Sequence, residues 1–214
     1  MMRRVWVVSA LLIGMALCAW PVTPVTSYAQ TGVNPGKVDN LDMTLRHLFV
    51  DHVFWVRSMV IATKAGNPDE AQVAYRMAIQ NANAFGAAVA SFYGQPAGTA
   101  FARLFTDHVN AVQEYCLADI RGDEAAKSAA AKKMTQNGEQ LATLLSSANP
   151  NLPKTAVLSL LGAHVAEHIA ECNAVAAGNL GQEAQTWDSM LKNIYAISDA
   201  LAGAIAKQFP SKFM

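Results

Sequence analysis

The stretch His164-Val165-Ala166-Glu167-His168-Ile169-Ala170-Glu171-Cys172 holds the densest group of potential metal ligands in the chain, and a repeat runs through it. A step of 56 residues leads from His164 back to His108, and a second step leads to His52. The same step relates further polar residues and glycines: Cys172 and Cys116; Asn193, Asn137 and Asn81; Gly178, Gly122 and Gly66. The sequence therefore predicts three copies of one unit, at residues 45–100, 101–156 and 157–213.

Each unit has the pattern of a helical hairpin. In the first unit, apolar residues between Leu41 and Thr63 recur at the spacing of one helix face. The segment Gly66-Asn67-Pro68-Asp69-Glu70 then provides a glycine to end one helix, and an N-cap and a proline to start the next. The other units turn at Gly122-Asp123 and Gly178-Asn179, and no stretch alternates as a strand does. We expect an all-α fold of six helices in three hairpins, forming one domain over residues 41–214.

The N-terminal residues have the pattern of a secretory signal peptide. Arg3 and Arg4 precede an apolar run that ends at Ala19, and Ala29 is a suitable cleavage site. We therefore expect a signal peptide at residues 1–29, a mobile leader at residues 30–40, and a periplasmic or secreted mature protein. Removal of the two arginines from a chain with 16 basic and 16 acidic residues leaves a slight negative charge, which argues against nucleic-acid binding. No later stretch predicts a membrane span.

The repeated histidines and asparagines are expected to lie side by side. His52 and Asn81 are about equally far from the Gly66-Asn67 turn, and the same holds for His108 with Asn137 and for His164 with Asn193. A buried imidazole needs a hydrogen-bonding partner, and an Asn side chain can accept its N–H or donate to its bare nitrogen. One interpretation is that the three pairs are structural clasps that fix the register of each hairpin.

The other interpretation is a metal site, and it depends on how the hairpins are arranged. If they close around a pseudo-threefold axis, His52, His108 and His164 meet at one height; in an open solenoid they lie too far apart. His168 adds a fourth imidazole at i+4, and each Asn would then orient a ligating ring. Copper or zinc would suit this chemistry. The candidate ligands are His52, His108, His164, His168, Glu171, Cys116 and Cys172, with Asn81, Asn137 and Asn193 behind the rings.

The sulfur atoms have simpler interpretations than metal ligation. Cys116 and Cys172 are the only cysteines that remain after signal cleavage, and in an oxidising compartment they can form a disulfide. A disulfide or two buried thiols is favoured over ligation.

Motifs typical of catalytic sites are weak or missing. The segment from His164 to His168 matches the His-x-x-Glu-His pattern of some zinc peptidases, but the repeat already accounts for His164, and the remaining residues offer no obvious third carboxylate ligand. No nucleophile elbow or phosphate-binding loop is present. A non-enzymatic role is therefore favoured.

One segment resembles a known group of proteins. The sequence Asp51-His52-Val53-Phe54-Trp55-Val56-Arg57 is similar to the Asp-His-Val-x-Trp-x-Arg motif of small helical proteins secreted by bacteria. The resemblance spans roughly residues 45–213. That group has no established activity, so the resemblance implies the domain limits and a helical fold, and it assigns no catalytic residue.

Two functions remain open from the sequence. The first is the binding of a copper or zinc ion through the repeated histidines. The alternative is a non-catalytic helical module that binds or scaffolds a protein or a small ligand through exposed aromatic residues such as Trp55 and Trp187, with the His-Asn pairs as structural clasps.

Overall fold

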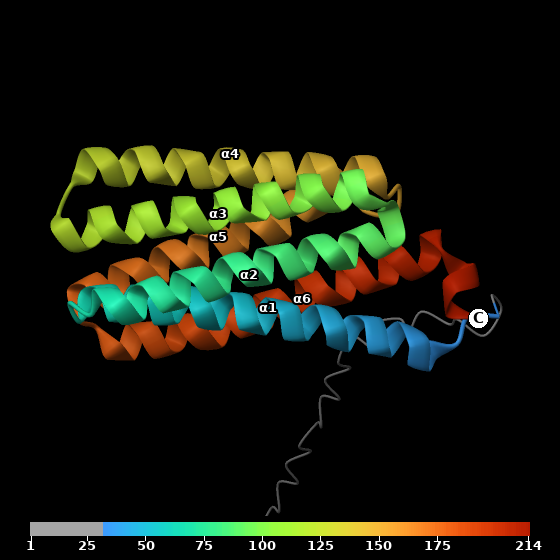
Figure 1. Ribbon diagram of the computed structural model, residues 1–214, viewed down its shortest axis with the longest axis horizontal. Coiled ribbons are helices and arrows are strands. Elements are labelled where there is room, and N and C mark those ends of the chain that lie inside the picture. The colour runs from blue at the N-terminus through green and yellow to red at the C-terminus, as the bar shows by residue number, and fades with distance from the viewer. Residues whose placement is uncertain (1–31) are drawn as a thin grey trace, which may run out of the picture.

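The computed structural model describes residues 32–214, and within this range it contains six α-helices and no strand (Figure 1). A short 3-10 helix, η2, follows the last α-helix. The elements are α1 (Pro35–Lys64), α2 (Pro68–Tyr93), α3 (Gln95–Arg121), α4 (Glu124–Ala148), α5 (Lys154–Ala177), α6 (Leu180–Gln208) and η2 (Pro210–Phe213). The predicted all-α, six-helix fold is confirmed. The predicted signal peptide lies outside the described residues.

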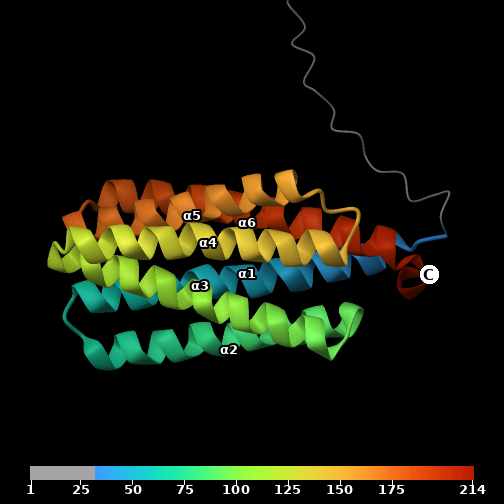
Figure 2. The ribbon, with the colours of Figure 1, turned by 90° about the horizontal axis from the view of Figure 1, so that it is seen from above.

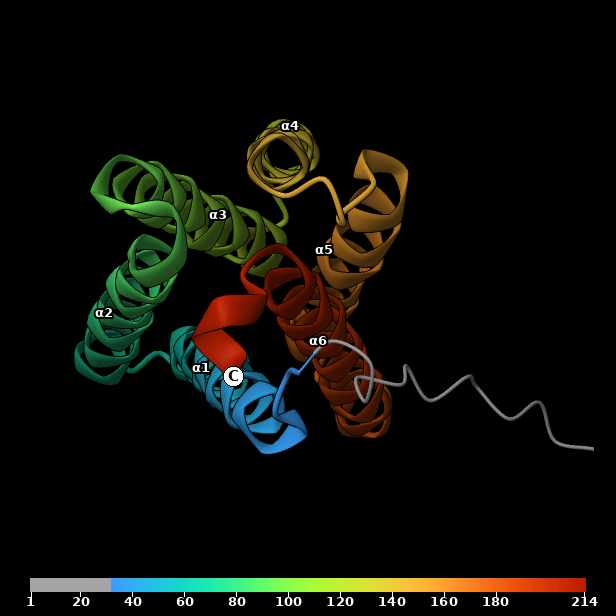
Figure 3. The same ribbon diagram turned by 90° about the vertical axis from the view of Figure 1, so that its right-hand side faces the viewer.

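The six helices close into a bundle in which consecutive helices run antiparallel (Figures 1 and 2). The first helices of the three hairpins, α1, α3 and α5, contact one another. Each second helix packs between two of them: α2 between α1 and α3, α4 between α3 and α5, and α6 between α5 and α1 (Figure 3). Because α6 returns to α1, the arrangement is the closed one, and the open solenoid is excluded.

The turns inside the three hairpins follow the local chemistry of the sequence. Gly66, Gly122 and Gly178 have φ values of 71°, 69° and 69°, a left-handed conformation that costs glycine little. The next residue caps the following helix in each case. The cap side chains accept backbone N–H groups: Asn67 from Glu70, Asp123 from Ala126, and Asn179 from Gln182.

Helix α1 begins at Pro35, so the expectation of a mobile leader over residues 30–40 is wrong for residues 35–40. Asn34 caps the helix, since its side chain accepts the N–H of Gly36 at 2.9 Å. Its own N–H donates to the carbonyl of Phe213 at 2.7 Å. Val38 packs in a small cluster with Ile205 and Phe213. The C-terminal segment thus holds the start of α1, a contact that periodicity within α1 cannot reveal.

A layer of buried histidines separates two apolar clusters inside the bundle. One cluster includes Phe49 of α1, Phe105 of α3 and Val157 of α5. The other includes Val56, Val112 and Cys172 of the same three helices. His52, His108, His164 and His168 lie in sequence between these two sets, and each is buried. The fold therefore places the histidines at the middle of the hydrophobic core.

Candidate metal centre

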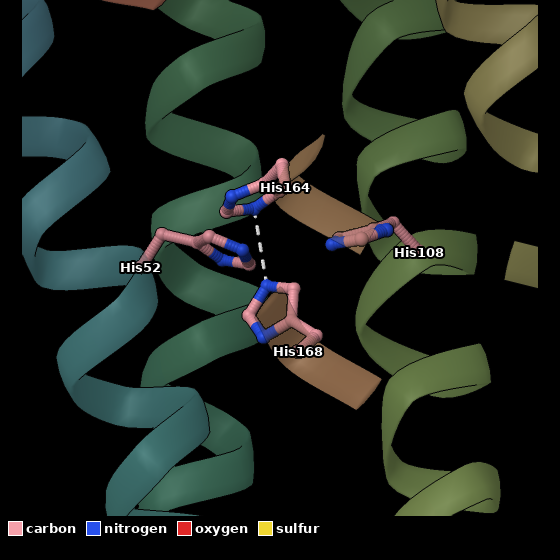
Figure 4. Close-up of side chains that lie close together, drawn as sticks. All are labelled: His52, His108, His164 and His168. Carbon is pink, nitrogen blue, oxygen red and sulfur yellow. Dashed lines mark hydrogen bonds between the residues drawn. The ribbon is translucent and has the colours of Figure 1, made fainter. Parts of the chain in front are cut away.

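Four histidines converge from three helices on one point in the core. His52 comes from α1, His108 from α3, and His164 and His168 from successive turns of α5. Their rings point toward one another (Figure 4). The side chains of His52 and His168 are completely buried, and those of His108 and His164 are 3% and 4% exposed. The closed arrangement thus brings together the four histidines that the sequence singled out.

The ring nitrogens are close enough to hold one metal ion. One nitrogen from each of the four rings can be chosen so that all of them lie within 4.8 Å of one another. Zinc binds imidazole nitrogen at about 2.0–2.1 Å, which in a tetrahedral site separates ligand atoms by about 3.3 Å. The Nε2 atoms of His164 and His168 are already 3.0 Å apart. Small rotations of the other rings would complete a four-coordinate site.

Most of the ring nitrogens have no hydrogen-bonding partner. Both nitrogens of His52 lack one, as do His108 Nε2, His164 Nδ1 and His168 Nδ1. A buried polar atom without a partner destabilises a protein by about 1–3 kcal/mol. Four such rings at one point are an unusual feature for a hydrophobic core. They match the donor set of a metal that prefers nitrogen ligands.

Burial keeps the four imidazoles in the neutral form that binds metals. Burial lowers the pKa of His168 to about 3, and burial together with the neighbouring His168 lowers the pKa of His108 to about 3. Burial is also the main cause that lowers the pKa values of His52 and His164 well below the usual range, and the adjacent histidines add to it. At neutral pH each ring therefore offers a free electron pair without first losing a proton.

The asparagines clasp the hairpins, but they do so through the backbone. The side-chain N–H groups of Asn81, Asn137 and Asn193 donate to the carbonyls of Leu48, Leu104 and Leu160 at 2.9, 2.8 and 3.2 Å. Each of these leucines precedes a histidine of the cluster by one helical turn. The predicted hydrogen bond between ring and amide is not formed at hydrogen-bonding geometry, since the Oδ1 atom of each Asn has no partner. Asn193 is nevertheless near enough to His164 to oppose the fall of its pKa. The acceptor capacity of these three amide oxygens is therefore unused.

The cysteines are not available as thiolate ligands. Cys116 of α3 and Cys172 of α5 are joined by a disulfide, with their Cα atoms 5.0 Å apart. Of the three interpretations of these residues, the disulfide is the one that the structure contains. The two residues lie at equivalent heights on helices that contact each other. Their sulfur atoms therefore bond to each other and are not ligands of the histidine cluster. The disulfide links two of the three helices that carry the histidines.

Glu171 lies outside the group of four ligand atoms. Its Oε2 atom is 3.8 Å from His168 Nδ1, while His168 Nε2 faces His164. Its Oε1 atom is 4.0 Å from Arg57 Nε, and Arg57 Nε contacts Glu183 Oε1 at 2.5 Å. Burial raises the pKa of Glu171 to about 8; Arg57 opposes this rise, and Glu183 adds to it. Glu171 is therefore a neighbour of the candidate centre rather than one of its four ligand atoms.

Sequence reasoning missed the partnership between Arg57 and Glu183. Arg57 belongs to α1 and Glu183 to α6, which lie in different hairpins, so the hairpin rule that paired His with Asn could not have found this contact. Trp187 covers the guanidinium of Arg57, with Cζ 5.1 Å from the ring centroid. Trp55 and Trp187, which the sequence singled out as exposed aromatic residues, are both half-buried.

Comparison with protein-family models, curated proteins and solved structures gives no match, so the function has to be argued from the site itself. Within residues 32–214, none of the helices combines the length and the hydrophobicity that a membrane crossing requires.

Proposed function

We propose that this protein binds one transition-metal ion, copper or zinc, in its core through His52, His108, His164 and His168. The observation that carries the proposal is the convergence of four buried imidazoles whose nitrogen atoms lie within 4.8 Å of one another. These residues supply nitrogen donors of the class that zinc and copper prefer over magnesium or calcium.

A purely structural role accounts poorly for the unpartnered nitrogens. A histidine retained as a clasp gains its stabilising effect from a hydrogen bond, yet His52 forms none through either nitrogen. The asparagines already fix the hairpins through backbone carbonyls, so the rings are not needed for that purpose. A bound ion would turn the unfavourable burial of these nitrogens into a favourable coordination energy.

The same arrangement favours holding a metal over catalysis by it. Catalytic zinc sites keep one coordination position open for water or substrate, whereas four protein ligands fill a tetrahedral site. The buried position also keeps solvent away. The three asparagine oxygens would accept ring N–H groups once the ligating nitrogens face the ion, which fixes the orientation of the rings. We therefore propose a non-enzymatic metal-binding protein.

A periplasmic or secreted location is part of the proposal. Two observations support it: the signal-peptide pattern at residues 1–29 and the disulfide between Cys116 and Cys172. Structural disulfides persist mainly in oxidising compartments.

Elemental analysis of the purified protein tests the proposal. The protein is exposed to zinc or copper and desalted, and the metal is counted per chain. We expect one equivalent in the wild type and a loss of retained metal in His108→Ala. His47→Ala is the matched control, because the His47 side chain is 77% exposed and pairs with Asp51 on the surface. If the wild type retains no metal, or if His108→Ala retains as much as His47→Ala, the proposal is wrong.

A further inference from the structure

The third hairpin contains two polar residues that the others lack. A step of 56 residues leads from His168 to Val112 and Val56, and from Glu171 to Tyr115 and Met59. His168 and Glu171 therefore occur together where the other hairpins have apolar or aromatic residues. Among the described carboxylates, Glu171 is the only one within ion-pair distance of any of the four clustered histidines. This co-occurrence suggests that the two residues act as a pair.

The two nitrogens of the His168 ring face different groups. Nε2 lies 3.0 Å from His164 Nε2, on the side of the cluster, while Nδ1 lies 3.8 Å from Glu171 Oε2. If Nε2 binds an ion, the ring proton must be on Nδ1, where it faces the carboxylate. A carboxylate in this position holds a ligating histidine in the required tautomer and strengthens it as a donor.

The Glu171 carboxyl can supply, in its ionised form, the negative charge that the four ligands lack. Neutral imidazoles leave the charge of a bound cation uncompensated, and burying such a charge in an apolar core is costly. Arg57 contacts Glu183 at 2.5 Å but Glu171 only at 4.0 Å, so its charge is mainly matched by Glu183. The Glu171 side chain is only 3% exposed, which leaves water little room to screen it. A cation in the cluster would favour the ionised form of Glu171 and provide its counter-charge.

We propose that Glu171 is the positioning residue and counter-ion of the metal centre: it would accept a hydrogen bond from the Nδ1–H of His168 and favour a divalent over a monovalent ion. This inference rests on the metal site proposed above. It adds that the ion held best is divalent, of the class of Zn²⁺, because the attraction to a fixed negative charge grows in proportion to the charge of the ion.

Competition with chromophoric chelators tests the inference in the full protein. The affinities for Zn²⁺ and for Cu⁺, the latter without oxygen and without thiols, are measured in the wild type and in Glu171→Gln. We expect Glu171→Gln to weaken Zn²⁺ binding by about 10–100-fold. Cu⁺ binding should weaken by only about the square root of that factor, because its charge is half as large.

The matched control is Glu167→Gln on the same helix. Glu167 accepts a hydrogen bond from Ser189 at 2.8 Å and lies one turn before Glu171, away from the ligand group. We expect this variant to bind both ions as the wild type does. Unchanged Zn²⁺ affinity in Glu171→Gln, or equal weakening of both ions, overturns the inference even if the site itself is real. A wild type that binds neither ion overturns the proposed function instead.

A spectroscopic measurement keeps the test decisive if Glu171→Gln fails to fold. In the zinc-loaded wild type we expect the His168 Nδ1–H proton to give a slowly exchanging, downfield NMR signal, as a ring N–H donating to a carboxylate does. Glu171→Asp retains the charge and should keep most of the preference for Zn²⁺. If the wild-type signal is absent, or if Glu171→Asp loses the preference completely, the inference is wrong.

Discussion

The Nε2 atoms of His164 and His168 lie 3.0 Å apart on successive turns of α5. Because both imidazoles are neutral, one ring must carry its proton on Nε2 for this contact to be a hydrogen bond. A metal ion bound to both Nε2 atoms would replace that shared proton and move the ring proton to Nδ1. This contact therefore connects the metal-free state to the metal-bound state through one change of tautomer.

His52→Leu should increase the stability of the metal-free protein while abolishing metal binding. His52 is fully buried, and neither of its nitrogens has a partner, so a leucine of similar volume removes the cost of burying them. We expect a gain of about 1–3 kcal/mol in the free energy of unfolding. Urea unfolding of the metal-free protein measures the gain. A loss of stability would mean that the ring makes favourable contacts in the metal-free core.

The stability of the metal-free protein should pass through a maximum near pH 6.5. The four buried histidines have folded-state pKa values far below 6.5, so the unfolded chain binds their protons first. Their contribution is present above pH 6.5 and is lost as the pH falls toward 3, by up to about 1.4 kcal/mol per pH unit for each ring.

Glu171 has the opposite effect on this pH profile. Its folded-state pKa of about 8 exceeds its ordinary value of 4.5, so its contribution is lost as the pH rises from 4.5 to 8. Between pH 4.5 and 6.5 the four histidines outweigh this single carboxyl, and above pH 6.5 Glu171 decides the slope among these five groups. Chemical unfolding from pH 5 to 9 measures the profile, and Glu171→Gln should remove the decline above pH 6.5. A continued rise to pH 8 in the wild type would contradict the expectation.

Replacement of Cys116 and Cys172 by alanine should destabilise the protein by about 4 kcal/mol, because the disulfide closes a long loop of the unfolded chain. The zinc affinity should also fall, since α3 and α5 carry His108, His164 and His168. Thermal unfolding and zinc competition of this variant measure both effects. Wild-type zinc affinity in the folded variant would show that the spacing of α3 and α5 is maintained without the disulfide.

Gly98→Ala should destabilise the contact between α2 and α3. A Cβ atom at Gly98 would lie 2.4 Å from the carbonyl oxygen of Gly86 and 2.6 Å from Ala90 Cβ, so the two helices would have to separate. We expect a loss of about 1–3 kcal/mol.

Gly138→Ala in α4 is the matched control for that variant, because a Cβ atom there meets nothing within 4 Å. This variant should gain up to about 1 kcal/mol from the higher helix propensity of alanine. Urea unfolding of both variants provides the comparison, and equal effects would argue against the close helix contact.

The six helices could be predicted from the sequence because their determinants are local. Apolar residues at helical spacing, Gly66, Gly122 and Gly178 at left-handed turns, and the caps at Asn67, Asp123 and Asn179 act within a few residues of each other. The start of α1 could not be predicted in this way, because Asn34 and Val38 contact Phe213 at the other end of the chain. The 56-residue repeat itself stays a prediction from the sequence.

The sequence by itself determined which residues could form a metal site, since imidazole spacing and hairpin symmetry place His52, His108 and His164 at one height. Only the tertiary structure decided that they meet, because the return of α6 to α1 closes the bundle. It also decided that Cys116 bonds to Cys172, that the asparagines bind backbone carbonyls, and that Glu171 faces the far side of His168. The physical reason is that periodicity fixes the height and face of a side chain on its own helix, whereas its neighbours depend on how the helices pack together.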